Sequence, residues 1–358
     1  MADDATPSAT GESAAGSASE IRQYRDRLES MSRRQFLLGA GATVGAVGGG
    51  RAVHNTMLGY GELGFGTNLL AQDLESLLTE HLRLTYDETF DDVRVWLADD
   101  GVGLVIDGSA RLVEFDDNPG SNVEADVANL DAELGLDGRL TGLFTVGSAL
   151  NAGEYTFEFH QPEAFFDRLA AAETSPDAVA ALRGGYDRDV DPSLVQRFTG
   201  VDPTETAAVV DGLIEGFREH SSYDVPRYLA GSIEDNVIFG LTDLRRHFTS
   251  PVDFESLLEA DETGMFCWEY VFRSMEALQA VPPWAQTVPV ASCYVTDRRH
   301  KHAFTGVVSA VEDDGLRFPT TFVDYTHSTV YDDFRMRWLL GEGLAAYDSR
   351  HRADEIYW

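Results

Sequence analysis

Three apolar runs near the end of the chain restrict the fold most, because each has the length and residue types of a buried strand. VPVASCYVTD (288–297) and HAFTGVVSAV (302–311) flank a short polar segment, and TTFVDY (320–325) follows. Two such runs joined by a few polar residues are typical of a β-hairpin, to which a further strand can add. Just upstream, residues 266–278 place apolar side chains three and four residues apart, as a helix does. We therefore expect an α+β fold with helices packed on an antiparallel sheet.

The preceding part of the chain also mixes helix-like and strand-like segments, which predicts a smaller α+β accessory region over residues 67–200. Residues 201–358 then form the second expected domain. The segments that carry the accessory patterns are, in order, a helix over 68–84, strands with Asp-Gly turns over 92–115, strands over 138–147 and 154–161, and a helix from Pro162.

The first 66 residues are expected to lie outside both domains. Residues 1–30 are rich in Ala, Ser, Asp, Glu and Gly and predict a disordered polar leader, and residues 51–66 predict a linker. Residues 31–50 hold Arg33 and Arg34 before a Phe-Leu-Leu start and a weakly apolar run, and this segment resembles a twin-arginine export signal. The resemblance implies an extracellular or cell-surface protein, with weak membrane association where the signal is not removed.

The charge of the chain indicates adaptation to concentrated salt. Its 358 residues include 61 acidic side chains against 27 basic ones, and Lys301 is the single lysine. The net charge of −34 is spread along the whole sequence, so it keeps the protein surface hydrated. Concentrated salt screens the repulsion between these charges, and the composition therefore predicts a halophilic source. Nucleic-acid binding is disfavoured, because it needs clustered Lys and Arg.

Cys267 stands at the expected start of the 266–278 helix, after the start signal Thr263-Gly264. Unpaired N–H groups and the helix dipole favour an anion at this end, so a thiolate would be stabilised there. His302 lies on the second strand of the hairpin, and Asp324 lies within the next strand between apolar neighbours. A buried carboxylate needs a partner, and a histidine on the adjacent strand would supply one.

The order Cys-Trp, His-Ala-Phe and Val-Asp-Tyr-Thr resembles the transglutaminase-like branch of the papain-type cysteine enzymes, over roughly residues 205–335. The resemblance implies a triad in which Cys267 attacks an amide of a protein or peptide substrate, His302 acts as general base and then acid, and Asp324 orients His302. It implies no cofactor. The glycine before the cysteine, Gly264, is one residue farther away than in the family, and Phe304 stands where tryptophan is commoner.

Two other interpretations use the same residues. An exported protein with only Cys267 and Cys293 could join them in a disulfide and keep the fold without catalysis. Alternatively, His300 and His302, which share a strand face, could bind zinc together with Asp324. If the Cys267 sulfur is free, the acyl group is transferred from the thioester either to water (hydrolysis) or to an amine (cross-linking). Lysine side chains are the usual amine acceptors, so their scarcity favours hydrolysis. The sequence leaves the oligomeric state open.

Overall fold

The computed structural model describes the parts of the chain in which the α+β architecture lies: residue 69 and residues 72–115, 122–183, 190–224, 227, 250–260, 262–298, 302–313, 315–326 and 352–358. The expected leader, export signal and linker lie outside these residues. One compact unit comprises Gly61–Tyr223 and Pro251–Trp358, and everything below concerns this unit. The boundary expected at residue 200 falls inside it. No helix among the described residues has the length and apolarity needed to cross a membrane.

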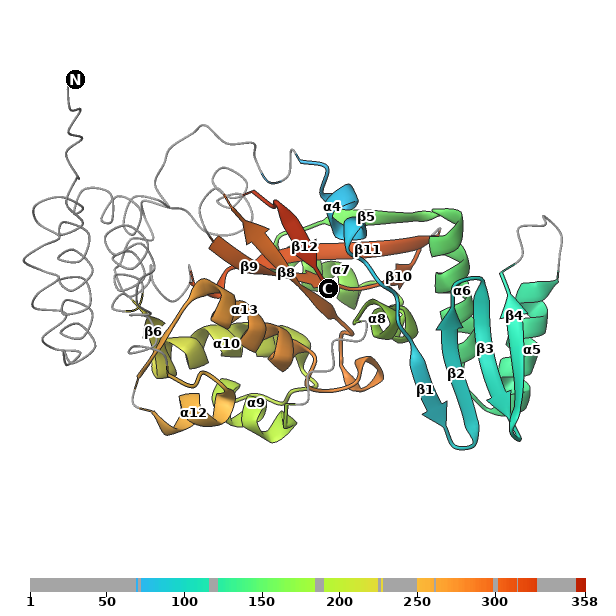
Figure 1. Cartoon of the computed structure of the whole chain (residues 1–358), viewed down its shortest axis with the longest axis horizontal. Helices are drawn as coiled ribbons and strands as arrows, with labels where there is room; N and C mark the ends of the chain where they lie inside the picture. Colours follow the sequence, from blue (N-terminus) through green and yellow to red (C-terminus); the bar gives the residue numbers. More distant parts are fainter. Residues whose placement is uncertain are drawn as a thin grey trace, which may run out of the picture. The chain divides into compact units, whose positions relative to one another are not determined.

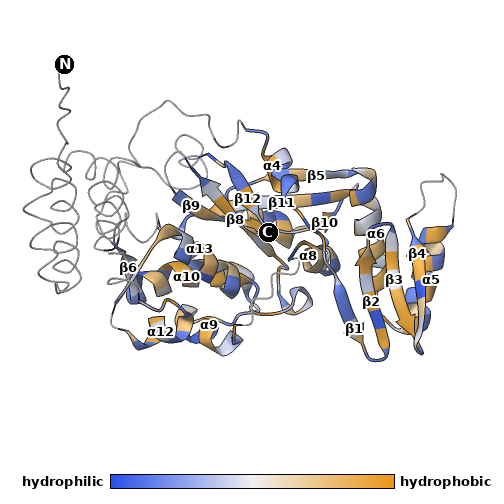
Figure 2. Cartoon of the chain, viewed as in Figure 1, coloured by the Kyte–Doolittle hydropathy of each residue, from blue (hydrophilic) through white to orange (hydrophobic). Residues whose placement is uncertain are grey.

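A four-stranded antiparallel sheet forms from the segment in which Asp-Gly turns were expected. Its strands follow the chain in the order β1 (Asp87–Phe90), β2 (Val93–Ala98), β3 (Gly101–Ile106) and β4 (Ser109–Glu114). Asp107 and Gly108 both have positive φ, 50° and 76°, as a two-residue hairpin turn requires. Figure 2 shows β1 as mostly hydrophilic and β3 as hydrophobic, in keeping with the burial of Val102 and Leu104.

The strand predicted over residues 138–147 is wrong, because these residues belong to helix α6 (Arg139–Ala152). Leu140, Leu143, Phe144 and Gly147 are buried along one side of this helix, at the spacing of a helix rather than of a strand. The buried side of α6 packs against α5 (Val123–Leu134) and the four-stranded sheet, and the three together form one core. Gly153 ends the helix in the left-handed conformation, with φ 70°.

The larger sheet contains the strands predicted near the end of the chain. The order of its strands is β10-β11-β9-β8-β12. A sixth strand, β5, lies outside this order and pairs in parallel with β11. The parallel pairing of β5 joins the expected accessory region to the C-terminal sheet. The strands are β5 (Tyr155–Phe159), β8 (Ala291–Asp297), β9 (His302–Val308), β10 (Val311–Glu312), β11 (Leu316–Val323) and β12 (Glu355–Tyr357).

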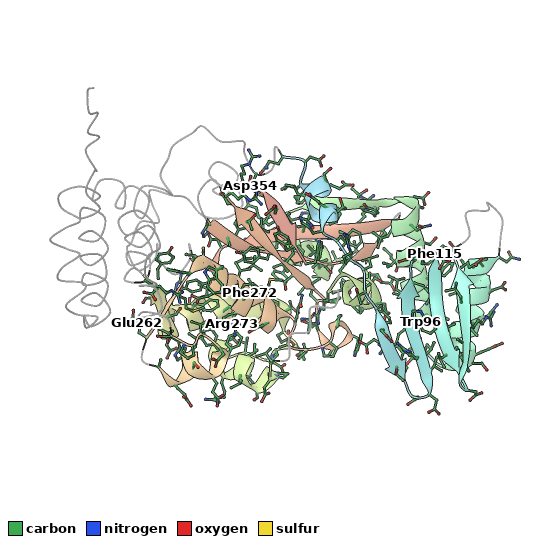
Figure 3. All side chains as sticks on the ribbon, viewed as in Figure 1. Trp96, Phe115, Glu262, Phe272, Arg273 and Asp354 are labelled. Carbon is green, nitrogen blue, oxygen red and sulfur yellow. The ribbon has the colours of Figure 1, made fainter. Side chains whose placement is uncertain are left out.

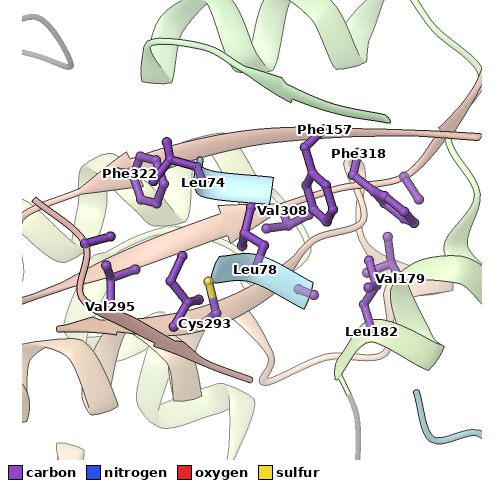
Figure 4. Packing of buried hydrophobic residues seen from close by; sticks show 14 of the residues in the cluster. Leu74, Leu78, Phe157, Val179, Leu182, Cys293, Val295, Val308, Phe318 and Phe322 are labelled. Carbon is purple, nitrogen blue, oxygen red and sulfur yellow. The ribbon is translucent and has the colours of Figure 1, made fainter. Parts of the chain in front are cut away.

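Helices cover the larger sheet and close two cores. One core contains Cys293, Val308 and Phe318 together with Leu74 and Leu78 of α4 (Leu74–Glu80), as Figure 4 shows. A second core lies between the sheet and α10 (Thr206–His220), α13 (Cys267–Leu278) and neighbouring elements, and α13 packs on β8 and β9 (Figure 1). The remaining elements are α7 (Pro162–Ala170), α8 (Pro176–Arg183), α9 (Pro192–Thr199), β6 (Ser221–Tyr223), α12 (Phe254–Glu259), β7 (Thr263–Met265) and the 3₁₀ turn η5 (Pro283–Ala285).

Candidate active site

Helix α13 begins at Cys267 itself, and this puts the thiol at the helix N-terminus. Phe266 has an extended backbone, with φ −100° and ψ 162°, and its N–H donates to Glu269 Oε2 over 2.7 Å. Glu269, the third residue of the helix, therefore satisfies the backbone that precedes the helix, as in a capping box. Thr263 and Gly264, the expected start signal, instead form β7, which pairs in parallel with β6.

The helix is held on the sheet by both polar and apolar contacts. The hydroxyls of Ser274 on α13 and Thr305 on β9 share a buried hydrogen bond of 2.6 Å. Val271 and Met275 of the helix pack with Ala303 of the same strand, and Cys267 packs at the edge of this small cluster. These contacts fix the helix start relative to the first residues of β9.

His302 and Asp324 form a buried pair at one end of the sheet. His302 is the first residue of β9, and Asp324 follows the last residue of the antiparallel strand β11, so the two residues lie at the same end. His302 Nε2 lies 2.7 Å from Asp324 Oδ2, and neither side chain is exposed to solvent. The partner that the sequence predicted for the buried carboxylate is therefore this histidine.

Cys267 completes the group, because it lies close enough to His302 to contribute to the raised pKa of the imidazole. Burial lowers the pKa of His302, but the charge and hydrogen bond of Asp324, and next the neighbouring Cys267, outweigh it and raise the pKa to about 10. The arrangement therefore favours an imidazolium ring between a carboxylate and a sulfur at neutral pH.

The first turn of α13 offers backbone donors beside the sulfur. The N–H groups of Glu269 and Tyr270 both donate to Phe266 O, over 2.9 Å and 3.1 Å. Among the hydrogen bonds between described residues, none uses the N–H of Cys267 or of Trp268. Such unpaired N–H groups at a helix start attract negative charge on a neighbouring atom.

Cys293 has a different environment, and the disulfide alternative is wrong for this structure. Both cysteines are free thiols. Cys293 is fully buried in the core that contains Val295 and Val308, whereas the next residue, Tyr294, packs with Cys267. Because successive strand residues point to opposite faces, the Cys293 sulfur points away from Cys267. Burial also raises the pKa of Cys293 to about 12.

The structure supplies no described ligand set for the zinc alternative. Within the described ranges, no group of three or more His, Cys, Asp or Glu is arranged to hold a metal ion. His302 Nε2 is already engaged by Asp324. His300, the other histidine of this alternative, lies outside the described residues.

Sequence reasoning missed two neighbours of the sulfur. Trp268, which directly follows Cys267 in a helix with a buried side, is 42 % exposed. Glu269 is buried despite its charge, and its position three residues after Phe266 was the available signal for a capping role. Apolar periodicity identifies the buried side of a helix, but it does not show whether a tryptophan at the margin of that side is covered.

Cys267, His302 and Asp324 thus come from three separate elements and meet at one end of the sheet. The wider comparisons identify no relative: no family model, no curated protein and no solved structure matches the chain.

Proposed function

We propose that the protein is a cysteine-dependent acyl-transfer enzyme that acts on peptide or side-chain amides through a thioester. The observation that carries this proposal is the geometry around one imidazole: His302 Nε2 lies 2.7 Å from Asp324 Oδ2, and Cys267 packs beside Ala303, the next residue of the strand, within electrostatic range of the ring. A nucleophile, a base within hydrogen-bonding reach and a third group that orients the base are the parts that covalent catalysis by a thiol needs.

The first half of the reaction forms the thioester. The proton already resides on His302, so Cys267 Sγ attacks the amide carbonyl carbon as the thiolate of a thiolate–imidazolium pair. The resulting oxyanion lies near the N–H groups of Cys267 and Trp268, which stabilise its charge. His302 then protonates the leaving amine as the C–N bond breaks, and the acyl group remains on sulfur.

In the second half, His302 removes a proton from water or from an acceptor amine, which attacks the thioester carbonyl. The C–S bond breaks, the acid or the new amide leaves, and the proton taken up by His302 stays on the ring, which restores the thiolate–imidazolium pair. Asp324 accepts a hydrogen bond from Nε2–H throughout, which fixes the tautomer and stabilises the imidazolium. Hydrolysis is the preferred outcome, since lysine is scarce in this chain and in substrates that share its composition.

We also propose that the fold around the site is transglutaminase-like. Support comes from the order of the three residues, from the sulfur at a helix start, and from an antiparallel sheet that carries His302 and Asp324. Gly264 in β7 and Phe304 in β9 remain the departures from the family pattern.

Export before action on an extracellular substrate is a further part of the proposal. It rests on the sequence of residues 31–50, in which Arg33 and Arg34 precede a weakly apolar run. Replacing both arginines with lysine in the native host is expected to retain the protein inside the cell, as fractionation and immunoblotting would reveal. Unchanged secretion of that variant would refute the export route.

The test of the activity uses hydroxylamine, a small amine that converts a thioester into a hydroxamate. A casein digest supplies the acyl donors, and hydroxamates are identified by mass spectrometry. We expect them with the wild type and with Cys293→Ala, and a loss of at least about 100-fold with Cys267→Ala and with His302→Ala. Hydroxamate formation that survives Cys267→Ala would overturn the proposal.

A further inference from the structure

A tryptophan is exposed directly beside the candidate nucleophile. Trp268 is 42 % exposed, and it is one of four large hydrophobic side chains in the described part of the chain that are exposed to this degree. A fold gains stability by burying such a ring. An uncovered ring next to a reactive sulfur therefore indicates a surface used for binding.

The tryptophan is one end of a continuous row of rings. Trp268 lies against Phe272, the residue one helical turn later, with ring centroids 6.0 Å apart. Phe272 in turn lies against Tyr294 of β8, at 5.5 Å. Figure 3 labels Phe272 on α13, beside the sheet.

The row continues across the edge of the sheet. Tyr294 is directly opposite Tyr357 of β12 in the antiparallel pairing, which brings their side chains together on one face. Tyr357 is 40 % exposed, and its ring stacks on His81 with centroids 4.6 Å apart. We call Trp268, Phe272, Tyr294, Tyr357 and His81 the aromatic strip; each member is exposed or half-buried.

The strip begins at the sulfur and continues along the edge of the sheet. Cys267 and Tyr294 pack against the same small cluster, so the thiol and the third ring are close neighbours. The pKa of Tyr294 is raised to about 12, chiefly by burial and next by Cys267 and Tyr357, which places all three within electrostatic range. A substrate bound on the rings would therefore have part of its chain at the nucleophile.

Two ion pairs lie beside the strip. Arg273 pairs with Glu276 on α13, and Arg298 pairs with Glu355 on β12. Paired charges offer little attraction to a charged substrate, whereas ring faces and edges favour apolar and aromatic groups.

We propose that the aromatic strip is the acyl-side specificity site, where it binds a large apolar or aromatic side chain of the peptide next to the amide that Cys267 attacks. This inference rests on the proposed function. Trp268 and Phe272, the rings nearest to the sulfur in the chain, make the main contact with that side chain. The rings of Tyr357 on β12 and of His81, which stacks on it, contact residues farther along an extended peptide.

The test compares two alkylating probes that differ only in one side chain, N-acetyl-phenylalanine chloromethyl ketone and N-acetyl-glycine chloromethyl ketone. Each forms a C–S bond with Cys267 and releases chloride. We expect the wild type to react about tenfold faster with the phenylalanine probe, which corresponds to about 1.4 kcal/mol of differential binding. Iodoacetamide, which carries no side chain, reports the reactivity of the sulfur itself.

Variants separate the strip from the catalytic group. Trp268→Ala is expected to remove most of the preference, measured as the ratio of the two probe rates in the same variant, and Trp268→Phe is expected to retain it. Trp284→Ala is the matched control, because Trp284 is 37 % exposed on η5, outside the strip. It should leave the preference unchanged.

The outcomes distinguish this inference from the proposed function. Alkylation of Cys267 that depends on His302 but shows no preference between the probes would overturn the strip and leave the function standing. A Cys267 that reacts with none of the three reagents would overturn both. A preference that Trp268→Ala leaves intact would also overturn the strip as the source of specificity.

Discussion

The two cysteines of this chain show how position alone separates a candidate nucleophile from a core residue. Cys267 is half-buried at the first residue of α13 and lies close to His302. Cys293 is fully buried in the middle of β8, surrounded by apolar side chains, and its pKa is raised to about 12. Cys267 therefore lies beside an ionisable partner at a helix start, whereas the apolar sheet face around Cys293 opposes a charged sulfur.

The largest expected effect is the difference in reactivity between the two sulfurs. In the folded protein at pH 7, iodoacetamide should modify Cys267 at least about 1,000-fold faster than Cys293, because Cys293 is neutral and inaccessible. Mass spectrometry of the digested protein measures the two sites separately. Similar rates at both cysteines, with the protein still folded by circular dichroism, would remove the distinction.

The pH dependence of stability tests the charge held beside Cys267. The folded pKa of His302, about 10, exceeds its ordinary value of 6.5. The stabilisation is therefore complete below pH 6.5 and is lost as the pH rises through about 10. We expect the free energy of urea unfolding to fall by about 4 kcal/mol more between pH 6 and pH 10 in the wild type than in His302→Gln.

Cys293→Ala is the control for that experiment. It removes a neutral buried thiol, so it should keep the pH dependence of the wild type below pH 10. The same dependence in His302→Gln would show that another group carries the effect.

Removing the imidazole should make Cys267 respond more like an ordinary thiol. We expect His302→Ala to slow the alkylation of Cys267 at pH 7 by about 100-fold, because general acid–base partners contribute effects of this size. His160→Ala is the matched control, since His160 lies 3.6 Å from Glu158 on β5, outside the candidate site. If both histidine variants kept the wild-type rate, His302 would have no part in activating the sulfur.

The smallest expected effect is on packing around Cys293. Cys293→Ala should reduce the free energy of unfolding by about 1–2 kcal/mol, because it leaves a small void in a fully buried core. Cys267→Ala, at a half-buried helix start, should cost less than about 0.5 kcal/mol. Urea denaturation of both variants measures the difference, and a larger loss for Cys267→Ala would reverse the assignment of structural and reactive thiols.

Gly306 can sharpen this last result. A Cβ added to Gly306 would lie 2.4 Å from Cys293 Sγ, so Gly306→Ala alone should be destabilising. In the double variant Cys293→Ala/Gly306→Ala, the new methyl group fills space that the sulfur has left. We expect the double variant to be more stable than the sum of the single effects by about 1 kcal/mol.

Local patterns predicted much of the C-terminal sheet and all three members of the candidate site. The hairpin around His302 appeared as β8 and β9, and the next predicted strand appeared as β11. Asp324 was expected within that strand, but β11 ends at Val323 and Asp324 follows it. Alternation and β-branched residues are properties of a few neighbouring residues, so they can be read without the fold. The prediction of a strand over residues 138–147 failed because glycines and β-branched residues in α6 obscured the helical spacing of its apolar residues.

Long-range pairings were not predictable in this way. Nothing local in residues 155–159 indicates that β5 pairs in parallel with β11, far along the chain. The exposure of Trp268 and its row of rings to His81 depend equally on which elements come to lie beside α13.

The sequence by itself determined the charge of the protein, the residue types of the candidate triad and the local elements that carry them. Only the tertiary structure decided that His302 bonds to Asp324 and lies close to Cys267, that Cys293 points into the opposite core, and that an aromatic strip begins at the sulfur. The physical reason is that hydrogen-bonded helices and strands form from neighbouring residues, whereas the distance between two side chains on separate elements is set by packing of the whole core.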